Sequence, residues 1–252
     1  MTERPGRLAA HRRDWEDLAE VDLFWSILSD PAKRHGAWNE EDYLRSGVVE
    51  IARHLARAAE LGHDTVWEDA LDFGCGAGRL TLALARRFER AVGVDVAAAM
   101  IAAAQRLGGG VENCRFVLND EPHLRVFADA SFDLVFTTIV LQHLPGRRTI
   151  ESYLREFVRI VRPGGLIIFQ LPCAIPVRHR LQPRGRAYRL LRRVGMPPSV
   201  LYRTLGLQPI RMQFIPVERV VSLLSDNGAR VLAVDQTPVS GIMSAVYYAE
   251  RR

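Results

Sequence analysis

The sequence has few of the features that mark secreted or membrane proteins. It contains three cysteines in 252 residues, the scattered Cys75, Cys114 and Cys173. A disulfide framework or a zinc site needs cysteines in larger numbers or at closer spacing, so both are disfavoured. No apolar run approaches the roughly 18 residues of a transmembrane helix, and the N-terminus lacks the apolar core of a signal peptide. We therefore expect a cytoplasmic protein without a transmembrane segment.

Negative charge is missing from one long stretch. Residues 157–217 contain no Asp or Glu but 11 arginines, whereas the whole chain has a net charge of +5, so the remainder is net acidic. Lys33 is the only lysine. The preference for arginine over lysine is therefore a general bias, whereas the absence of acids is local. A field of one sign favours an anionic partner.

The N-terminal part of the chain has helical patterns. Apolar residues at helical spacing predict a helix over 15–28, which stops at Ser29-Asp30-Pro31. Asn39 is a favourable N-cap, and the three acidic residues after it predict a second helix that ends before Gly62. With 48% hydrophobic residues, the chain can bury one substantial core.

From Asp69 onwards, strand-like runs alternate with helical patterns, which is typical of βαβ units and a parallel sheet. The turn between the last two strands is too short for a crossover helix, so the final strand should be antiparallel. The predicted fold class is α/β, a Rossmann-like doubly wound sheet of seven strands with an antiparallel last strand. The predicted strands are 70–73, 91–94, 115–118, 132–137, 166–171, 231–235 and 242–249, and the predicted helices among them are 79–88, 97–107, 149–161 and 216–228.

Residues 70–80, ALDFGCGAGRL, join the first strand to a helix through Gly74, Gly76 and Gly78. Glycines allow a sharp turn and let backbone N–H groups approach a ligand, which a Cβ would obstruct. The N-terminus of the following helix favours negative charge. Alone, the motif is weak, because glycines between a strand and a helix also form plain tight turns.

Polar residues follow the next two predicted strands. Asp95 ends the second strand, about twenty residues after the loop, where a carboxylate can accept both hydroxyls of a ribose. Taken alone, Asp95 is equally suited to cap a helix that begins near Ala97. Asn119 and Asp120 follow the third strand, where a carboxylate could accept the exocyclic amine of adenine. These positions predict a nucleotide site at the carboxyl edge of the sheet.

With these residues in place, the sequence resembles the class I S-adenosylmethionine-dependent methyltransferases, specifically the type 11/12-like domain. The segments that carry the resemblance are 71–78, Asp95, 119–120, 132–135 and 161–165. The antiparallel last strand separates this family from nicotinamide- and flavin-binding Rossmann domains, which share the glycine loop and the ribose acid. The resemblance implies an enzyme that uses S-adenosylmethionine and releases S-adenosylhomocysteine.

The resemblance also implies a domain organisation. Residues 1–66 would form an N-terminal helical segment, and residues 67–252 the methyltransferase domain. Residues 173–213 would be an inserted cap, a basic insertion on the substrate side of that domain.

Family roles can be carried over to matching positions. Asp72 would help to hold the ammonium group of the cofactor, often through water, and Asp95 would bind the ribose. Met100 would lie beside the adenine, and Asp120 would accept its amine, a role that Asn119 would share or replace. The full implied cofactor site is Asp72, Gly74, Cys75, Gly76, Gly78, Arg79, Asp95, Val96, Met100, Asn119, Asp120, Glu121 and Thr137.

His143 is the candidate catalytic base, because in this family the loop after the fourth strand lies over the transferring methyl group. Methyl transfer needs an aligned nucleophile, and a hydroxyl or amine acceptor also needs a base. The alternative is that His143 only fixes the loop, as a helix-capping or core-edge histidine. Ile139 and Gln142 stand near where some O-methyltransferases of the family have metal-binding glutamates, so we predict no metal.

The Arg-rich stretch 178–211 lies where family members insert substrate-recognition elements. Residues 186–194 predict a short amphipathic helix with Tyr188 and Leu191 inward, Leu190 as a further candidate for that side, and the arginines outward. The stretch is compatible with a lid that clamps an anionic substrate, with a surface for RNA or an anionic membrane, or with a merely solvated face. RNA recognition favours interleaved aromatic residues, of which this stretch has only Tyr188 and Tyr202.

We therefore predict methyl transfer from S-adenosylmethionine to oxygen or nitrogen of a small, anionic metabolite. The alternatives are an RNA methyltransferase that uses the Arg-rich stretch and a non-catalytic cofactor-binding regulator. The sequence leaves the acceptor, the catalytic base and the oligomeric state open.

Overall fold

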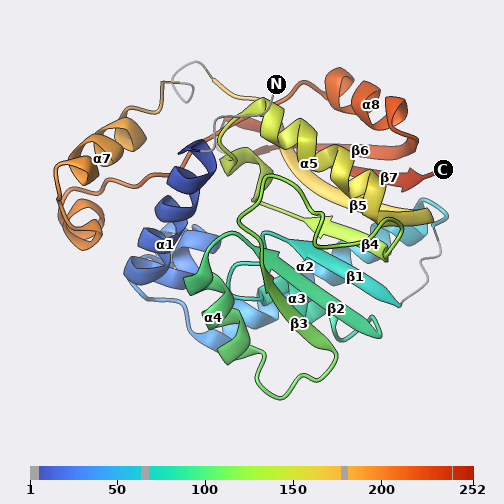
Figure 1. Ribbon diagram of the computed structural model, residues 1–252, viewed down its shortest axis with the longest axis horizontal. Coiled ribbons are helices and arrows are strands. Elements are labelled where there is room, and N and C mark those ends of the chain that lie inside the picture. Colours follow the sequence, from blue (N-terminus) through green and yellow to red (C-terminus); the bar gives the residue numbers. More distant parts are fainter. Residues whose placement is uncertain (1–5, 64–67, 177–180, 240) are drawn as a thin grey trace.

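A computed structural model describes residues 6–63, 68–176, 181–239 and 241–252. A seven-stranded sheet runs through the molecule in the order β3-β2-β1-β4-β5-β7-β6 (Figure 1). Neighbouring strands from β3 to β5 are parallel, whereas β7 is antiparallel to both β5 and β6. This confirms the predicted fold class. The strands are β1 Asp69–Phe73, β2 Arg90–Asp95, β3 Cys114–Leu118, β4 Phe132–Thr137, β5 Val161–Ala174, β6 Ala229–Val239 and β7 Ile242–Arg251.

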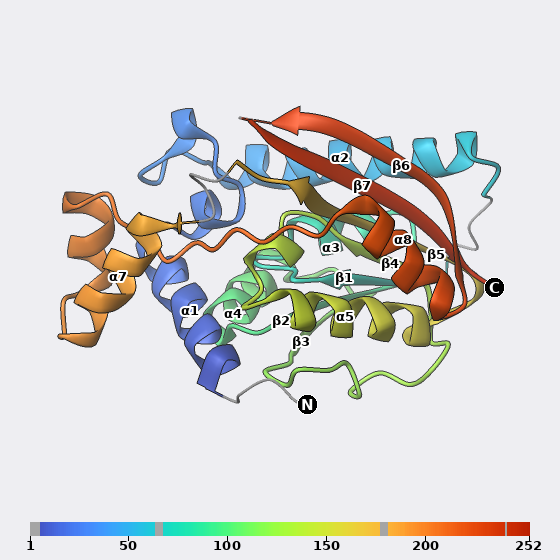
Figure 2. The ribbon, with the colours of Figure 1, turned by 90° about the horizontal axis from the view of Figure 1, so that it is seen from above.

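Helices cover both faces of the sheet (Figure 2). On one face, the apolar sides of α5 and α8 join Leu71, Phe73 and Val135 in a large buried cluster. On the other face, α2 and α3 pack against Ala70, Leu134 and Phe136. Alternate residues of a strand point to opposite faces, so β1 and β4 contribute to both clusters. The helices are α1 Gly6–Ile27, α2 Glu40–Glu60, α3 Arg79–Leu84, α4 Ala98–Leu107, α5 Arg147–Ile160, α7 Pro183–Arg193 and α8 Val217–Asp226.

The first helix differs most from the prediction. It begins at Gly6, whereas the prediction began at position 15. The prediction missed the first turns because it followed apolar residues only, and the buried residue His11 is polar. Its backbone leaves helical geometry at Asp22 (φ −164°, ψ 80°), so α1 consists of two helical stretches. The Asp22 carboxylate accepts hydrogen bonds from the backbone N–H groups of His35 and Gly36, which holds the chain at this kink.

Residues 181–205 form an arm at one end of the molecule, beside α1 (Figures 1 and 2). We call this segment the α7 arm; it contains α7 and the π-helix Val200–Thr204. As predicted, Tyr188 is buried. Leu190, the further candidate for the inner side, is 63% exposed, and the prediction that the arginines point outward is wrong for Arg192. Arg192 pairs with Asp17 of α1 at 2.9 Å, because α1 presents an acidic side to the arm.

Among the described residues, no helix combines the length and the apolar character needed to cross a membrane.

Candidate active site

A cavity lies where β1, β2 and β4 end, in contact with α1. The sheet side of its wall includes residues at or just after the ends of β1, β2 and β3, and one residue of α4. They are Gly74, Cys75, Gly76, Asp95, Val96, Asn119 and, from α4, Met100. Four residues of α1 form the opposing part of the wall: Leu8, His11, Trp15 and Ile27. Residues 138–140 after β4 and Leu144 also line the cavity. The cavity therefore joins the carboxyl edge of the sheet to the N-terminal helix.

The glycine loop is shaped by left-handed backbone conformations. Gly74, Gly76 and Gly78 have φ values of +73°, +52° and +83°, which side-chain-bearing residues rarely adopt. A Cβ on Gly74 would overlap Val140, and a Cβ on Gly76 would lie 2.8 Å from Cδ1 of Ile27. The absence of side chains is therefore what allows the loop to approach the other walls of the cavity.

Asp95 fixes the glycine loop while lining the cavity. Its Oδ2 accepts the N–H of Gly76 at 2.9 Å, and its Oδ1 accepts the N–H of Ala97 at 3.0 Å. Burial raises the pKa of Asp95, although these backbone hydrogen bonds act in the opposite direction. Each carboxylate oxygen can accept about two hydrogen bonds, so Asp95 retains capacity for the hydroxyls of a ligand.

Arg79 is the first residue of α3, and it brings a buried positive charge to the cavity wall. Its guanidinium lies 2.8 Å from the Glu50 carboxylate, which also accepts a hydrogen bond from Thr138 at 2.7 Å. Burial opposes ionisation of Glu50, but the Arg79 charge and these hydrogen bonds hold its pKa below the usual value. The Nε of Arg79 is buried and has no hydrogen-bond partner among the described residues. A buried donor of this kind is costly unless a ligand satisfies it.

The structure brings eight of the expected site residues to the cavity wall: Gly74, Cys75, Gly76, Arg79, Asp95, Val96, Met100 and Asn119. The others lie outside it. Asp72 is buried behind the loop, where it accepts a hydrogen bond from Thr81 at 2.7 Å, and burial raises its pKa to about 7. Gly78 packs against Phe116. Thr137 is fully buried at the end of β4.

The two expected residues after Asn119 face α1 and α5 instead of the cavity. The Asp120 carboxylate pairs with Arg12 of α1 at 2.6 Å, with both side chains about half exposed. Glu121 is exposed, and its carbonyl oxygen accepts a hydrogen bond from the Tyr153 hydroxyl at 2.9 Å. The ion pair with Arg12 therefore holds the Asp120 carboxylate towards α1.

His143 lies outside the cavity wall. Its Nδ1 is 2.6 Å from the carbonyl oxygen of Arg211 and therefore donates a hydrogen bond to it. Burial lowers the pKa of His143 to about 4, and its ring meets the edge of Trp15. These contacts tie the loop after β4 to the segment that follows the α7 arm.

Sequence reasoning missed His11, the histidine that does line the cavity. It is 5% exposed, makes no hydrogen bond to a described residue, and packs edge-on against Trp15. Burial, together with the charge of Arg211 and with His143, lowers its pKa to about 3. The signal was present as the helical spacing of Leu8, His11 and Trp15, but a helix predicted to begin at position 15 excluded two of them.

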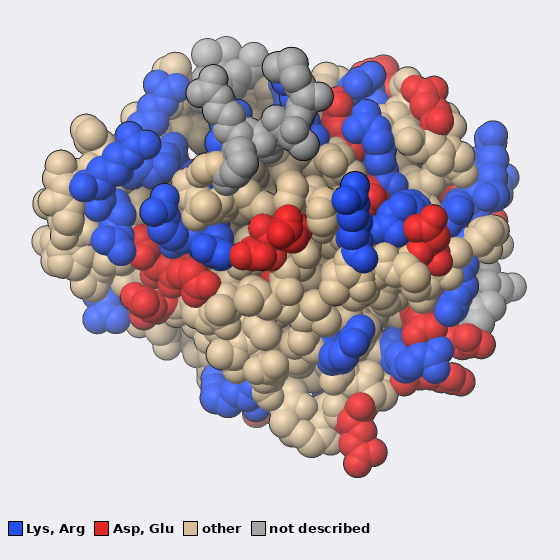
Figure 3. Space-filling model, in the orientation of Figure 1, with Lys and Arg blue, Asp and Glu red and all other residues tan. Residues whose placement is uncertain are grey.

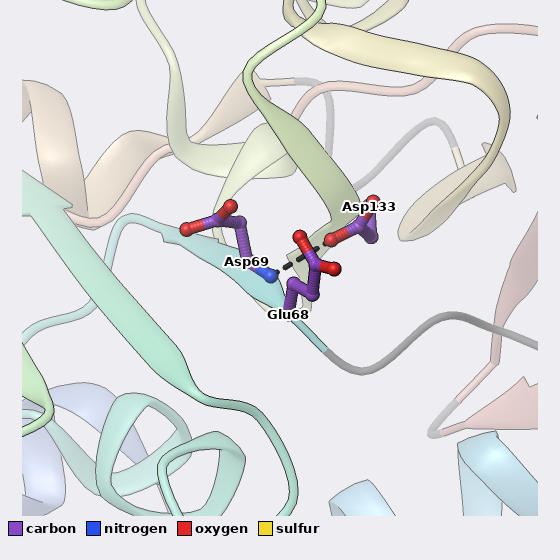
Figure 4. Close-up of side chains that lie close together, drawn as sticks. All are labelled: Glu68, Asp69 and Asp133. Atoms are coloured by element: carbon purple, nitrogen blue, oxygen red, sulfur yellow. Dashed lines mark hydrogen bonds between the residues drawn. The ribbon is translucent and has the colours of Figure 1, made fainter.

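A cluster of three carboxylates lies at the opposite, amino end of the sheet (Figure 4). Asp133 accepts the backbone N–H of Asp69 at 2.8 Å, as the dashed line in Figure 4 marks, and Glu68 lies beside them. Arg162 bridges Asp69 and Asp133, at 2.8 and 2.6 Å, and Arg90 pairs with Asp69. The two guanidinium groups offset most of the negative charge, and the cluster ties the starts of β1 and β4 together.

The sheet order, the antiparallel β7 and the glycine loop after β1 are the arrangement typical of class I S-adenosylmethionine-dependent methyltransferases. Residues 71–169 match the family described as "Methyltransferase domain". Among solved structures, magnesium protoporphyrin IX methyltransferase from Synechocystis PCC 6803, with bound SAH, superposes with a TM-score of 0.61. That match covers 97% of this chain and 99% of the other at 18% identity, which shows a shared fold.

Two similar curated proteins are trans-aconitate 2-methyltransferases. The protein from Azoarcus sp. (strain BH72) is 34% identical over 142 residues, which cover 54% of this chain and 51% of the length of that protein. The protein from Deinococcus radiodurans is 37% identical over 141 residues, covering 54% and 49%. The match to this chain thus spans about half the length of these relatives.

Proposed function

We propose that the protein transfers a methyl group from S-adenosylmethionine to an oxygen or nitrogen atom of a small, anionic metabolite. The observation that carries this proposal is the cavity between the glycine loop and α1, at whose wall eight expected residues meet. The bound cofactor would supply an electrophilic methyl group on a sulfonium, so the protein's task is to align an acceptor with it.

The residues at the cavity fit this cofactor. Asp95 has carboxylate lone pairs for the ribose hydroxyls, and the buried Nε of Arg79 would donate to the carboxylate of the methionine portion. Met100 is buried at the wall and offers an apolar contact for the adenine ring. The glycines of the loop keep side chains out of the cavity, so that the backbone can lie close to the ligand.

We assign the role of general base to His11. His11 lines the cavity, whereas Nδ1 of His143 is committed to the Arg211 carbonyl outside its wall. With a pKa of about 3, His11 is neutral near pH 7 and can accept a proton from a hydroxyl or amine. An anionic acceptor beside it would offset the charge of Arg211 and raise the pKa of His11 towards the range where a base works best.

Two observations support a small anionic acceptor over RNA. The relatives named trans-aconitate 2-methyltransferases are named for a small acid with several carboxylates. Tyr188 and Tyr202, the aromatic residues of the Arg-rich stretch, are each 1% exposed and therefore unavailable for stacking on bases.

The decisive experiment incubates the protein with methyl-labelled S-adenosylmethionine and an extract of its source cells, which is then separated into small-molecule, RNA and protein fractions. Label among small molecules that depends on Asp95, with Asp95→Ala as control, is the expected result and delivers a product to identify. Label in RNA would mean that the methyl acceptor is a nucleic acid and not a small metabolite. If calorimetry shows tight cofactor binding but no fraction contains labelled product, the result would favour a non-catalytic regulator that binds the cofactor.

A further inference from the structure

Exposed apolar side chains gather on the α7 arm. The described part of the chain exposes ten large hydrophobic side chains, and five of them fall within residues 181–205. They are Leu181, Leu190, Val194, Val200 and Leu205, between 39% and 74% exposed. Single exposed apolar residues are ordinary, but such a concentration in one short segment marks a contact surface.

The outer side of α7 combines these apolar residues with arginines. Tyr188 faces inward, where its hydroxyl donates to Asp17 at 3.0 Å, and Arg192 pairs with the same carboxylate. Arg186, Leu190 and Arg193 follow one another at steps of four and three residues, which places them on one side of the helix, and all three are exposed. Val194 directly follows this stripe and is 74% exposed.

The arm carries no negative charge to oppose its arginines. Residues 157–217 contain no Asp or Glu, and within the described residues no carboxylate forms an ion pair with Arg184, Arg186, Arg193 or Arg203. In Figure 3, blue side chains gather over the arm at the left of the molecule, and a group of red ones lies beside them. The arm forms one end of the molecule in both ribbon views (Figures 1 and 2). A flat surface could therefore approach it from outside.

We propose that the outer surface of the α7 arm docks onto an anionic lipid bilayer. Arginines beside exposed aliphatic side chains match the two layers of such a bilayer, since the charges meet the headgroups and Leu190 and Val194 enter the acyl boundary. A nucleic acid would use the arginines but would leave the aliphatic side chains without a role, and the tyrosines of the arm are buried. This proposal goes beyond methyl transfer and does not depend on it.

The test is flotation of the full chain with vesicles of phosphatidylglycerol and phosphatidylcholine in equal parts, compared with vesicles of phosphatidylcholine alone. The protein should float only with the anionic vesicles and should be released at high ionic strength. Arg186→Gln and Arg193→Gln should each lower partitioning about fivefold, the fold-change that corresponds to about 1 kcal/mol per basic residue near an anionic surface. Leu190→Ser and Val194→Ser should each lower it about tenfold.

Matched controls lie elsewhere on the molecule. Val49 on α2 is 64% exposed, so Val49→Ser repeats the Val194→Ser change away from the arm. Arg86→Gln and Arg87→Gln remove exposed charges near the end of α3. These controls should leave partitioning unchanged, and circular dichroism should show that every variant is folded.

Failure to float with anionic vesicles would overturn the proposal, as would equal losses in the control variants. Retained flotation after Leu190→Ser and Val194→Ser would also overturn it. A transfer RNA added as competitor tests the other polyanion. If it binds through Arg186 and Arg193 without dependence on Leu190 or Val194, the arm is a nucleic-acid surface and the bilayer assignment is wrong.

Discussion

The two sides of the cavity are held in different ways. The sheet side is shaped mainly by backbone, since the loop from Gly74 to Gly78 lies close to its strand and Asp95 fixes it through backbone N–H groups. The helical side depends on side chains that are distant in sequence, such as the pair of Arg211 with Asp14, at 3.0 Å, and the pair of Arg192 with Asp17. Under the proposed function, we expect the cofactor to bind at the sheet side and the helical side to decide which acceptor is used.

The largest expected effect is a loss of kcat on substitution of His11, which would show that the helical side of the cavity takes part in the reaction. His11→Gln should lower kcat by about 10²–10⁴-fold, because it removes the proposed base, while cofactor affinity stays nearly the same. His143→Gln is the matched control and should lower kcat by less than tenfold, since His143 lies outside the wall. Steady-state kinetics on the product identified by labelling measures both. A greater loss in His143→Gln would return the role of base to His143.

A large effect on stability is expected at the buried ion pair of Arg79 and Glu50, which joins α3 to α2. Arg79→Met should lower the free energy of unfolding by about 3–5 kcal/mol, because it leaves the Glu50 carboxylate buried without its partner. The double variant Arg79→Met/Glu50→Leu should recover much of that loss, since no unpaired charge remains. Urea denaturation measures the three proteins. If the double variant is as unstable as Arg79→Met, the loss comes from packing and the pair has little importance.

The dependence of the free energy of unfolding on pH should reveal the lowered pKa values of the two buried histidines, His11 and His143. The pKa values of His11 and His143 lie at about 3 and about 4, below the ordinary value of 6.5, so the unfolded chain takes up protons that the folded protein does not. Their contribution to stability is present above pH 6.5 and is lost as the pH falls towards 4. At pH 5 the loss is about 2 kcal/mol per histidine.

The variant His11→Gln/His143→Gln should therefore show a flatter profile than the parent chain. Asp14 acts with the opposite sign, because burial raises its pKa to about 6, and its effect is common to both proteins. Urea denaturation at pH 7 and pH 5 measures the difference. Equal slopes for the two proteins would mean that the histidines are not buried as neutral groups.

The smallest effect concerns the attachment of the arm to α1. Asp17→Asn should lower the free energy of unfolding by about 1 kcal/mol, because Arg192 is 43% exposed and water screens its charge. Asp120→Asn, which weakens the half-exposed pair with Arg12, is the control and should cost less than about 0.5 kcal/mol. Limited proteolysis of the arm should rise only in Asp17→Asn. Equal proteolysis in both variants would mean that Asp17 does not anchor the arm.

The sheet was predictable from sequence because its signals are local. Strand periodicity and the glycines locate β1 and β4 to within one residue, and the short final turn correctly predicts an antiparallel β7. The helical side was not predictable, because its partners carry no local signal. Asp14 and Arg211 stand 197 positions apart, and the kink at Asp22 depends on His35 and Gly36.

The candidate site divides in the same way. Asp95 and Gly76 could be placed at the cavity from their positions at and after the ends of strands, whereas His11 is a polar residue of a helix that was predicted to begin after it. Asp120 follows a strand as expected, but a contact with Arg12 draws it towards α1. Tertiary contacts of this kind decide where a side chain points, and no spacing along the chain encodes them.

The position of β7 between β5 and β6 has a consequence for synthesis on the ribosome. Among the described strands, β6 pairs with β7 alone, although β6 is translated first. Until residues 242–251 have left the ribosome, β6 has no partner strand and β5 presents an open edge. Such an edge is a template for pairing with other chains, so a nascent chain stalled after β6 would be prone to aggregation. The order of the strands thus means that the open edge of β5 is covered only after β7, the last strand, has been synthesised.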